Sequence, residues 1–139
     1  MDISLNHTLM EALGMEIETA DKDRVQIKMP VDERTHQPMG YLHGGASAAL
    51  AESAASIGAY LNVNPATHQV FGMEINANHM KSVRSGFVKG TAEPLHIGRN
   101  SMVWSIEIKS DEGQLLSIAR CTIGVVPINS ERKTGKESI

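Results

Sequence analysis

Polar and apolar residues alternate along several segments of the chain, which is the period of a β-strand that buries one face. In the N-terminal part, Arg24–Met29 has this alternation, and Met15–Thr19 before it is predicted to form a second strand. The polar segment Ala20–Asp23 predicts a hairpin turn between the two. Ahead of both strands, Asn6 is predicted to cap a short helix that Gly14 ends.

The second half of the chain has the same alternating character. Four further strands are predicted, at Gln69–Met80, Gly86–Glu93, Ser101–Lys109 and Gln114–Val126. In the first of them the apolar positions alternate with glycine, glutamate and asparagine, and are Phe71, Met73, Ile75 and Ala77. We expect these four side chains to share one face of the strand.

One long segment has helical periodicity instead, from about Gly45 to Leu61, and the irregular Pro30–Gly44 before it is predicted to be a loop. An apolar stripe of the helix falls within about 40° of its centre on a helical wheel. Its members are Ala46, Leu50, Ala54, Ile57 and Leu61. The order of two strands, one long helix and four strands predicts an α+β fold, an antiparallel sheet with the helix laid on one face.

The long helix carries a single residue that is charged at neutral pH, Glu52, with Ser56 one turn later. The face opposite the apolar stripe holds Ala48, Ala55 and Ala59, which permit close approach of another backbone. We therefore expect this face to be covered, by the rest of the domain or, as the preferred alternative, by a second subunit. A carboxylate on a covered face is either paired or functional, because burying it alone is costly. A solvated glutamate is the simpler alternative.

The approach to the helix is His43-Gly44-Gly45. Glycines let the main chain come close to a ligand, and the first N–H groups of a helix have no partners inside it. The Gly44 N–H is therefore a candidate donor to a carbonyl oxygen, and to the oxyanion that develops when that carbonyl is attacked. Gln37 and His43 flank the turn as further possible donors. A plain tight turn with solvated neighbours is the alternative.

The bulk properties narrow the class of protein. The 139 residues fit one domain, and a net charge of −3 argues against a nucleic-acid-binding protein. No apolar run is long enough to span a membrane, and the N-terminus does not resemble a secretory signal. A cytoplasmic protein is therefore expected.

The single cysteine, Cys121, lies in an apolar run and is predicted to be a buried strand residue. The six histidines lack metal-ligand spacing, so no metal site is predicted.

Two linked segments, Gln37–Ser47 and Leu50–Ser53, resemble the hotdog-fold acyl-CoA thioesterases. The spacing of the glutamine, glycine and glutamate matches the branch that contains the 1,4-dihydroxy-2-naphthoyl-CoA thioesterases, the proofreading thioesterases of siderophore synthesis and the Arthrobacter type of 4-hydroxybenzoyl-CoA thioesterase. Two later segments, Asn76–Gly86 and Pro94–Arg99, are similar to this group as well. The likeness covers roughly Leu9–Pro127.

The resemblance implies a single hotdog domain over residues 1–129, in which a curved antiparallel sheet wraps the long helix. It leaves residues 130–139 as a polar tail, which we expect to be flexible. It also implies a dimer with two active sites between the subunits, often paired into a tetramer. No metal or organic cofactor is implied, since coenzyme A is part of the substrate.

The resemblance further implies roles for the residues of the motif. Glu52 would act as nucleophile or general base on the thioester carbonyl, and the Gly44 N–H would polarise that carbonyl with help from Gln37 or His43. Ser56 would lie near Glu52 and the attacking water. Substrate and coenzyme A contacts are implied for Gly72, His79, Met80, Lys81, Ser82, His96, Ile97, Gly98, Arg99, Asn100 and Ser101. Arg84 joins this set as a cationic side chain suited to phosphate.

The acyl group is expected to be aromatic, of the hydroxybenzoyl or dihydroxynaphthoyl type. Short aliphatic chains and the rescue of misloaded carrier proteins stay as alternatives. Two other kinds of function use the same fold. One is a non-catalytic acyl-CoA-binding module, and the other is an enoyl-CoA hydratase, for which the helix lacks the expected Asp/His pair.

Overall fold

The computed structural model describes residues 3–128, in which the chain forms two helices and six strands. The elements are α1 (Leu9–Ala12), β1 (Glu16–Asp21), β2 (Arg24–Pro30), α2 (Gly44–Tyr60), β3 (His68–His79), β4 (Phe87–Ile97), β5 (Ser101–Ser110) and β6 (Leu115–Pro127). The predicted α+β architecture is confirmed, and most boundaries lie within one or two residues of the expected ones. The predicted tail at residues 130–139 lies outside the described residues.

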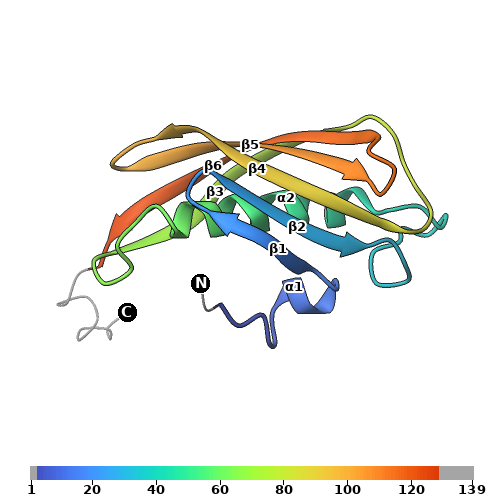
Figure 1. Ribbon diagram of the computed structural model, residues 1–139, viewed down its shortest axis with the longest axis horizontal. Coiled ribbons are helices and arrows are strands. Elements are labelled where there is room, and N and C mark those ends of the chain that lie inside the picture. The colour runs from blue at the N-terminus through green and yellow to red at the C-terminus, as the bar shows by residue number, and fades with distance from the viewer. Residues whose placement is uncertain (1–2, 129–139) are drawn as a thin grey trace.

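The six strands form one antiparallel sheet in the order β1-β2-β4-β5-β6-β3. The sheet curves over α2, which packs against all six strands (Figure 1). This is the hotdog arrangement of one long helix in a wrapped sheet. β1 and β3 are the two edge strands, so β3 has no partner on its outer side among the described residues.

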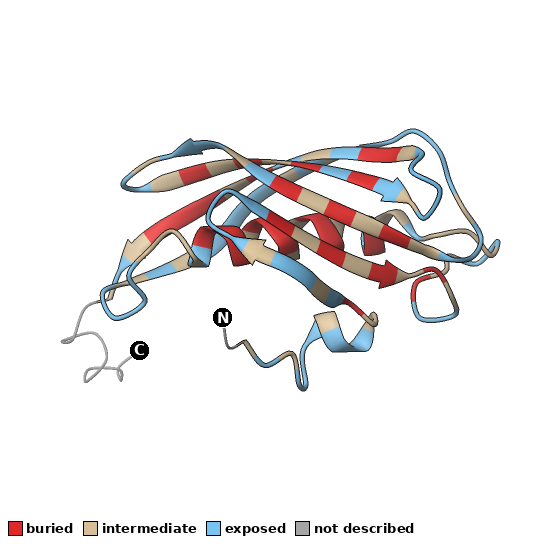
Figure 2. Ribbon diagram, in the orientation of Figure 1, coloured by how far each residue is buried: buried red, intermediate tan, exposed pale blue. Residues whose placement is uncertain are grey.

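The core lies between α2 and the concave face of the sheet. Buried residues mark α2 and alternate positions of β2 and β4 (Figure 2). Two glycines let helix and sheet approach closely, because a Cβ on Gly58 would overlap the Trp104 ring and one on Gly90 would lie 3.0 Å from Leu50 Cγ. The predicted apolar stripe of the helix therefore does face the core, with Leu50 completely buried.

The alanine face of α2 is covered in part by the chain's own sheet. Ala55 and Ala59 have no exposed surface, so the simpler of the two expected covers, the rest of the domain, accounts for them. Ala48, Glu52 and Ser56 are only half-buried. A stripe with a carboxylate at its centre is thus left partly open.

Local chemistry explains where the elements differ from expectation. Thr8, rather than Asn6, caps α1, because its hydroxyl accepts from the Glu11 N–H while the Glu11 carboxylate accepts from the N–H of His7. At the first hairpin β1 extends to Asp21, whose side chain accepts from two backbone N–H groups of the turn. β4 runs past Pro94, where an irregularity in its pairing with β5 accommodates the missing N–H.

The predicted face of β3 is wrong in its first half. Phe71 and Met73 are exposed, whereas Ile75 is half-buried against the core. The cause is a bulge between Gly72 and Glu74, which inserts one residue and reverses the alternation. As a result Gly72, and not its apolar neighbours, faces α2.

Candidate functional site

The loop before α2 is held by several hydrogen bonds and ends in the helix cap. The Leu42 N–H bonds to the Val83 carbonyl at 2.9 Å, and the His43 N–H bonds to the Thr35 carbonyl at 2.8 Å. Arg34 hydrogen-bonds to Asp32 in the same loop, which lowers the pKa of that carboxyl. These contacts fix the backbone that presents the first turn of the helix.

His43 is the N-cap of α2. Its Nδ1 accepts from the Gly45 N–H at 2.7 Å, so this nitrogen is occupied by the helix. The ring also borders a separate hollow of about 260 Å³, beside Leu9 and Arg34. The structure therefore gives His43 a capping contact, while its predicted bond to a substrate carbonyl stays a prediction.

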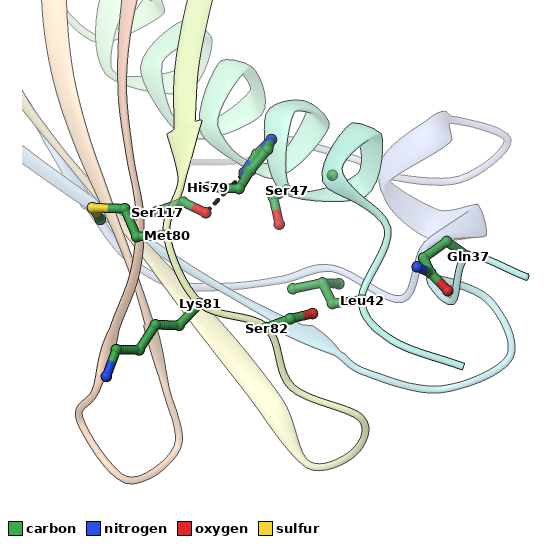
Figure 3. A pocket seen from close by; sticks show the side chains of 9 residues that line it. Gln37, Leu42, Ser47, His79, Met80, Lys81, Ser82 and Ser117 are labelled. Carbon is green, nitrogen blue, oxygen red and sulfur yellow. Dashed lines mark hydrogen bonds between the residues drawn. The ribbon is translucent and has the colours of Figure 1, made fainter. Parts of the chain in front are cut away.

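A cavity of about 290 Å³ opens at the start of α2 (Figure 3). It brings together six of the residues expected from the sequence with three that were not. Its lining is Gln37, Leu42, Gly44, Ser47, His79, Met80, Lys81, Ser82 and Ser117. We call it the Gly44 cavity.

Two polar donors in this cavity are free to bind a ligand. The Gly44 N–H begins the helix and bonds to no acceptor within residues 3–128. The Gln37 Oε1 accepts from the N–H groups of Met39 at 2.5 Å and Tyr41 at 3.3 Å. The amide oxygen of Gln37 is therefore occupied by hydrogen bonds from the loop, and its NH₂ group points toward the cavity (Figure 3).

Glu52 lies in a second and larger space of about 700 Å³, the Glu52 groove. Its walls are mostly apolar and come from α2, from β3 and from the N-terminal segment. The lining is Ile3, Leu9, Met10, Ala49, Glu52, Ser53, Ser56, Ile57, Tyr60 and Val70. Glu52 and Ser56 share the groove as expected, although no hydrogen bond joins them in the described part of the chain.

The Glu52 carboxylate lies against the backbone of Gly72 on β3. A Cβ at residue 72 would overlap Oε2 of Glu52, so only glycine leaves room for the carboxylate in this position. The bulge in β3 is what turns Gly72 toward the helix. The structure therefore gives Gly72 a contact with Glu52, while its predicted contact with the substrate stays a prediction.

Gly44 and Glu52 do not meet within one chain. They are eight residues apart on α2, a rise of about 12 Å, and they line different cavities. β3 shows the same division, since His79 pairs with Ser117 near the first and Gly72 pairs with Ile123 near the second. Each chain therefore presents two separate halves of the expected machinery.

The predicted coenzyme A contacts are divided between the two ends of the sheet. The turn from His96 to Ser101 lies at the Gly72 end of the sheet, because Gly124 pairs with Ser101 on one side and with Phe71 on the other. It is thus distant along the strands from Lys81. Among the sheet residues, the turn is fixed by a 2.8 Å bond from the Gly98 N–H to the Ser101 carbonyl and by a 2.9 Å bond from the Val125 N–H to the Asn100 carbonyl.

Arg84 lies at the mouth of a third hollow of about 530 Å³ with Ser82 and the acidic pair Asp111 and Glu112. Its guanidinium stacks on the Tyr41 ring at 4.3 Å and donates to the Tyr41 hydroxyl at 3.1 Å. This arrangement holds the cation at the surface near the Gly44 cavity. Its bond to a phosphate stays a prediction.

Cys121 is completely buried between β3 and β5, as its apolar surroundings predicted. Burial raises the pKa of its thiol to about 12, with smaller contributions from the negative charges of Glu52 and Glu74. The thiol is therefore kept protonated and unreactive.

Across residues 3–128 no group of three or more His, Cys, Asp or Glu side chains could hold a metal ion, and no helix is long and apolar enough to cross a membrane.

Several residues of these cavities were not expected from the sequence. Ser117 is one of two hydroxyl residues in the mostly apolar strand β6, and its importance depends on a cross-strand neighbour that only the register reveals. Tyr60 follows Ser56 by one helical turn and could have been found from that spacing. Ile3, Leu9 and Met10 carry no local signal, because they reach the groove through the path of the N-terminal segment.

Comparison with known proteins gives consistent results. A family model described as the thioesterase superfamily matches residues 39–117. ComA2 of Bacillus subtilis is 52% identical over 89% of this chain and 98% of its own length. The 1,4-dihydroxy-2-naphthoyl-CoA hydrolase of Listeria monocytogenes is 50% identical over 84% and 94%. The crystal structure of a Pseudomonas aeruginosa thioesterase, solved as a single-residue mutant, superimposes with a TM-score of 0.87 at 43% identity, covering 89% of each chain.

Proposed function

The chain belongs to the thioesterase superfamily, and from this premise we propose that it hydrolyses an acyl-CoA thioester in a site shared by two copies of the chain. The observation that carries the proposal is the division of the machinery. The Gly44 cavity holds donors for a carbonyl oxygen, and the Glu52 groove holds the carboxylate and an apolar wall. Two copies that meet with α2 helices antiparallel would bring the Gly44 half of one to the Glu52 half of the other.

The outer edge of β3 supports such a pairing. A long edge strand with apolar side chains is a site for another strand to add. β3 has twelve residues, with Phe71 53% exposed and Met73 68% exposed. A second copy of the chain that pairs here would cover both residues and the open stripe of α2 beside them. Further pairing of dimers into a tetramer is part of the same proposal.

The chemistry follows from the groups that would then converge. The Gly44 N–H and the Gln37 NH₂ would hold the thioester oxygen and stabilise the oxyanion that forms. Glu52 would take a proton from water, the hydroxide would attack the carbonyl carbon, and the tetrahedral intermediate would expel coenzyme A thiolate, which regains the proton. Alternatively Glu52 attacks directly, giving a mixed anhydride that water then hydrolyses. Ser56 would contact the water in either route.

The acyl group that fits the Glu52 groove best is an aromatic one. The groove is mostly apolar, and Glu52, Ser56 and Tyr60 follow one another at four-residue spacing along one face of α2. A flat ring attached to the carbonyl can lie along this face, with its hydroxyl groups near Ser56 or Tyr60. Two relatives are 1,4-dihydroxy-2-naphthoyl-CoA hydrolases, from Listeria monocytogenes and Escherichia coli, which favours a bicyclic hydroxyaryl group.

A proofreading role on misloaded acyl carriers is the second candidate. The proofreading thioesterase EntH of Cronobacter turicensis is 44% identical over 86% of the chain. Both candidates need a cationic rim for the phosphates of the substrate arm. Lys81 at the Gly44 cavity and Arg84 on the surface near it are suited to that contact, and so is Arg99 at the Gly72 end of the sheet.

The test is release of free thiol from a panel of aryl- and alkyl-CoA esters and acyl-loaded carrier protein, for wild type and Glu52→Gln. We expect aryl-CoA turnover that falls by about 10² to 10⁴ in the variant, since a positioned acid–base group contributes that much. Binding of acyl-CoA without turnover would favour the non-catalytic module. Hydration of crotonyl-CoA without hydrolysis would favour the hydratase.

A further inference from the structure

A buried hydroxyl and an imidazole form a pair beside Gly44. Ser117 on β6 is 2% exposed, and its Oγ lies 2.9 Å from Nδ1 of His79 on β3 (Figure 3). The two residues are directly opposite each other in the strand register, so the pair is built by the sheet. Neither side chain has another hydrogen-bond partner within residues 3–128.

The direction of this hydrogen bond follows from the burial of Ser117. A hydroxyl has one proton to donate, and leaving it without an acceptor in the interior is costly. The acceptor on hand is Nδ1 of His79. If Ser117 donates to Nδ1, that nitrogen is unprotonated, and the neutral ring carries its proton on Nε2.

The Nε2 edge of His79 faces Gly44. A Cβ placed on Gly44 would lie 3.0 Å from Nε2 and 3.1 Å from Cδ2 of the ring. Because glycine lacks that atom, the imidazole can stand directly beside the first turn of α2. Gly44, Gln37 and His79 then border the same cavity.

We infer that Ser117 is a positioning residue, which holds His79 in the tautomer that presents Nε2–H to the Gly44 cavity as a donor to an acyl-CoA carbonyl. The inference rests on the proposed function for the identity of the ligand. The acceptor is a carbonyl oxygen, either that of the thioester or an amide carbonyl of the pantetheine arm. A donor to the thioester acts most strongly on the developing oxyanion, whereas a donor to the amide acts on binding alone.

The tautomer is measured directly by NMR of the protein with ¹⁵N-labelled histidine, at about pH 8.5, where free imidazole is neutral. The His79 signals are assigned by their loss in His79→Gln. We expect the Nε2–H tautomer in wild type and in Ser117→Thr, which keeps the hydroxyl. In Ser117→Ala we expect a mixture of tautomers. A predominant Nδ1–H tautomer in wild type, or one unaffected by Ser117→Ala, would overturn the inference.

Kinetics on the preferred ester identify the carbonyl. Ser117→Ala removes the hydrogen bond that orients His79, so we expect kcat/KM to fall about three- to tenfold. A fall in kcat at constant KM assigns the thioester oxygen, and a rise in KM at constant kcat assigns the pantetheine amide. Unchanged constants contradict a role for the pair in the site. Thr91→Ala, which removes a hydroxyl on β4 bonded to Gln26, is the matched control and should change neither constant.

The two proposals can fail separately. A wild-type protein that cleaves no thioester overturns the proposed function, while the NMR result still decides whether Ser117 fixes the ring. A wild-type protein that is active, with unchanged kinetics and tautomer in Ser117→Ala, overturns this inference alone.

Discussion

The carboxylate of Glu52 on α2 occupies the space that a side chain at Gly72 on β3 would fill. The two residues are distant in the sequence, and a bulge in β3 brings them into contact. The atom that a Cβ would meet is the far end of a flexible side chain, which can rotate away. A larger residue at this position should therefore displace the carboxylate while the fold is retained.

Gly72→Ala is expected to lower kcat by about 10- to 100-fold, because a misplaced catalytic group costs up to that much. Its melting temperature should stay close to that of wild type. The matched control is Gly113→Asn in the exposed turn before β6, where no atom of residues 3–128 lies within 4 Å of the added Cβ and asparagine tolerates the positive φ. Equal activities in the two variants would mean that the contact between Glu52 and Gly72 has no part in catalysis.

The burial of Cys121 predicts that the native protein does not react with thiol reagents. Its pKa of about 12 leaves the thiol protonated at neutral pH, whereas the unfolded chain has the ordinary value of 9.0. Reaction with a thiol-reactive dye should require unfolding, and the signal of a turnover assay should therefore come from coenzyme A alone. Rapid labelling of the folded protein at neutral pH would show that the strand opens.

Because the pKa of the Cys121 thiol is raised in the folded state, the free energy of unfolding should depend on pH in the alkaline range. Below 9.0 the thiol is protonated in both states and the dependence is absent. As the pH rises from 9.0 toward 12 the unfolded thiol ionises while the folded one does not, so the free energy of unfolding falls. Denaturant titrations of wild type and Cys121→Ala across this range should show a steeper loss in wild type. Parallel curves would contradict the assigned cause.

Tyr60 is expected to select the acyl group. It closes the Glu52 groove two helical turns after Glu52, where it can contact a ring but not a short chain. Tyr60→Ala should lower kcat/KM about tenfold for an aryl-CoA and leave an acetyl-CoA-sized substrate within about twofold. Ile118→Ala removes an apolar side chain of nearly the same exposure, 41% against 40% for Tyr60, that lines neither the Gly44 cavity nor the Glu52 groove, and it should leave both substrates unchanged. An equal loss on the two substrates for Tyr60→Ala would exclude a role in selection.

The sequence predicted the architecture because α2 and the strands have clear periods. The stripe around Leu50 specified the buried face of the helix, and the alternation in Ser101–Lys109 predicted a strand with one buried face, which β5 has. The prediction that was wrong concerned a local feature, the buried face of β3 in its first half. The bulge in β3 could not be seen from Phe71 and Met73, since an apolar residue at a bulge looks the same as one in a regular strand.

The candidate site was predicted as a set of residues but not as an arrangement. The resemblance implied sites between subunits but not which residues each chain supplies, and the helical rise places Gly44 and Glu52 of one chain in separate cavities. Ser117 was missed because its partner, His79, is defined by strand register rather than by sequence distance. The contact of Gly72 with Glu52 was missed because it depends on the bulge in β3, and the substrate contact that the resemblance implied for Gly72 stays a prediction.

The most direct test of the shared site is complementation between two inactive variants, Gln37→Ala and Glu52→Ala. Each homodimer would have a defect in both sites. A mixed dimer would have one site with both defects and one site with the native glutamine and glutamate. Unfolding and refolding an equal mixture should restore about a quarter of the wild-type activity per subunit, if mixing is random. Recovery at that level supports a site built from two copies of the chain, and no recovery in dimers shown to have mixed would contradict it.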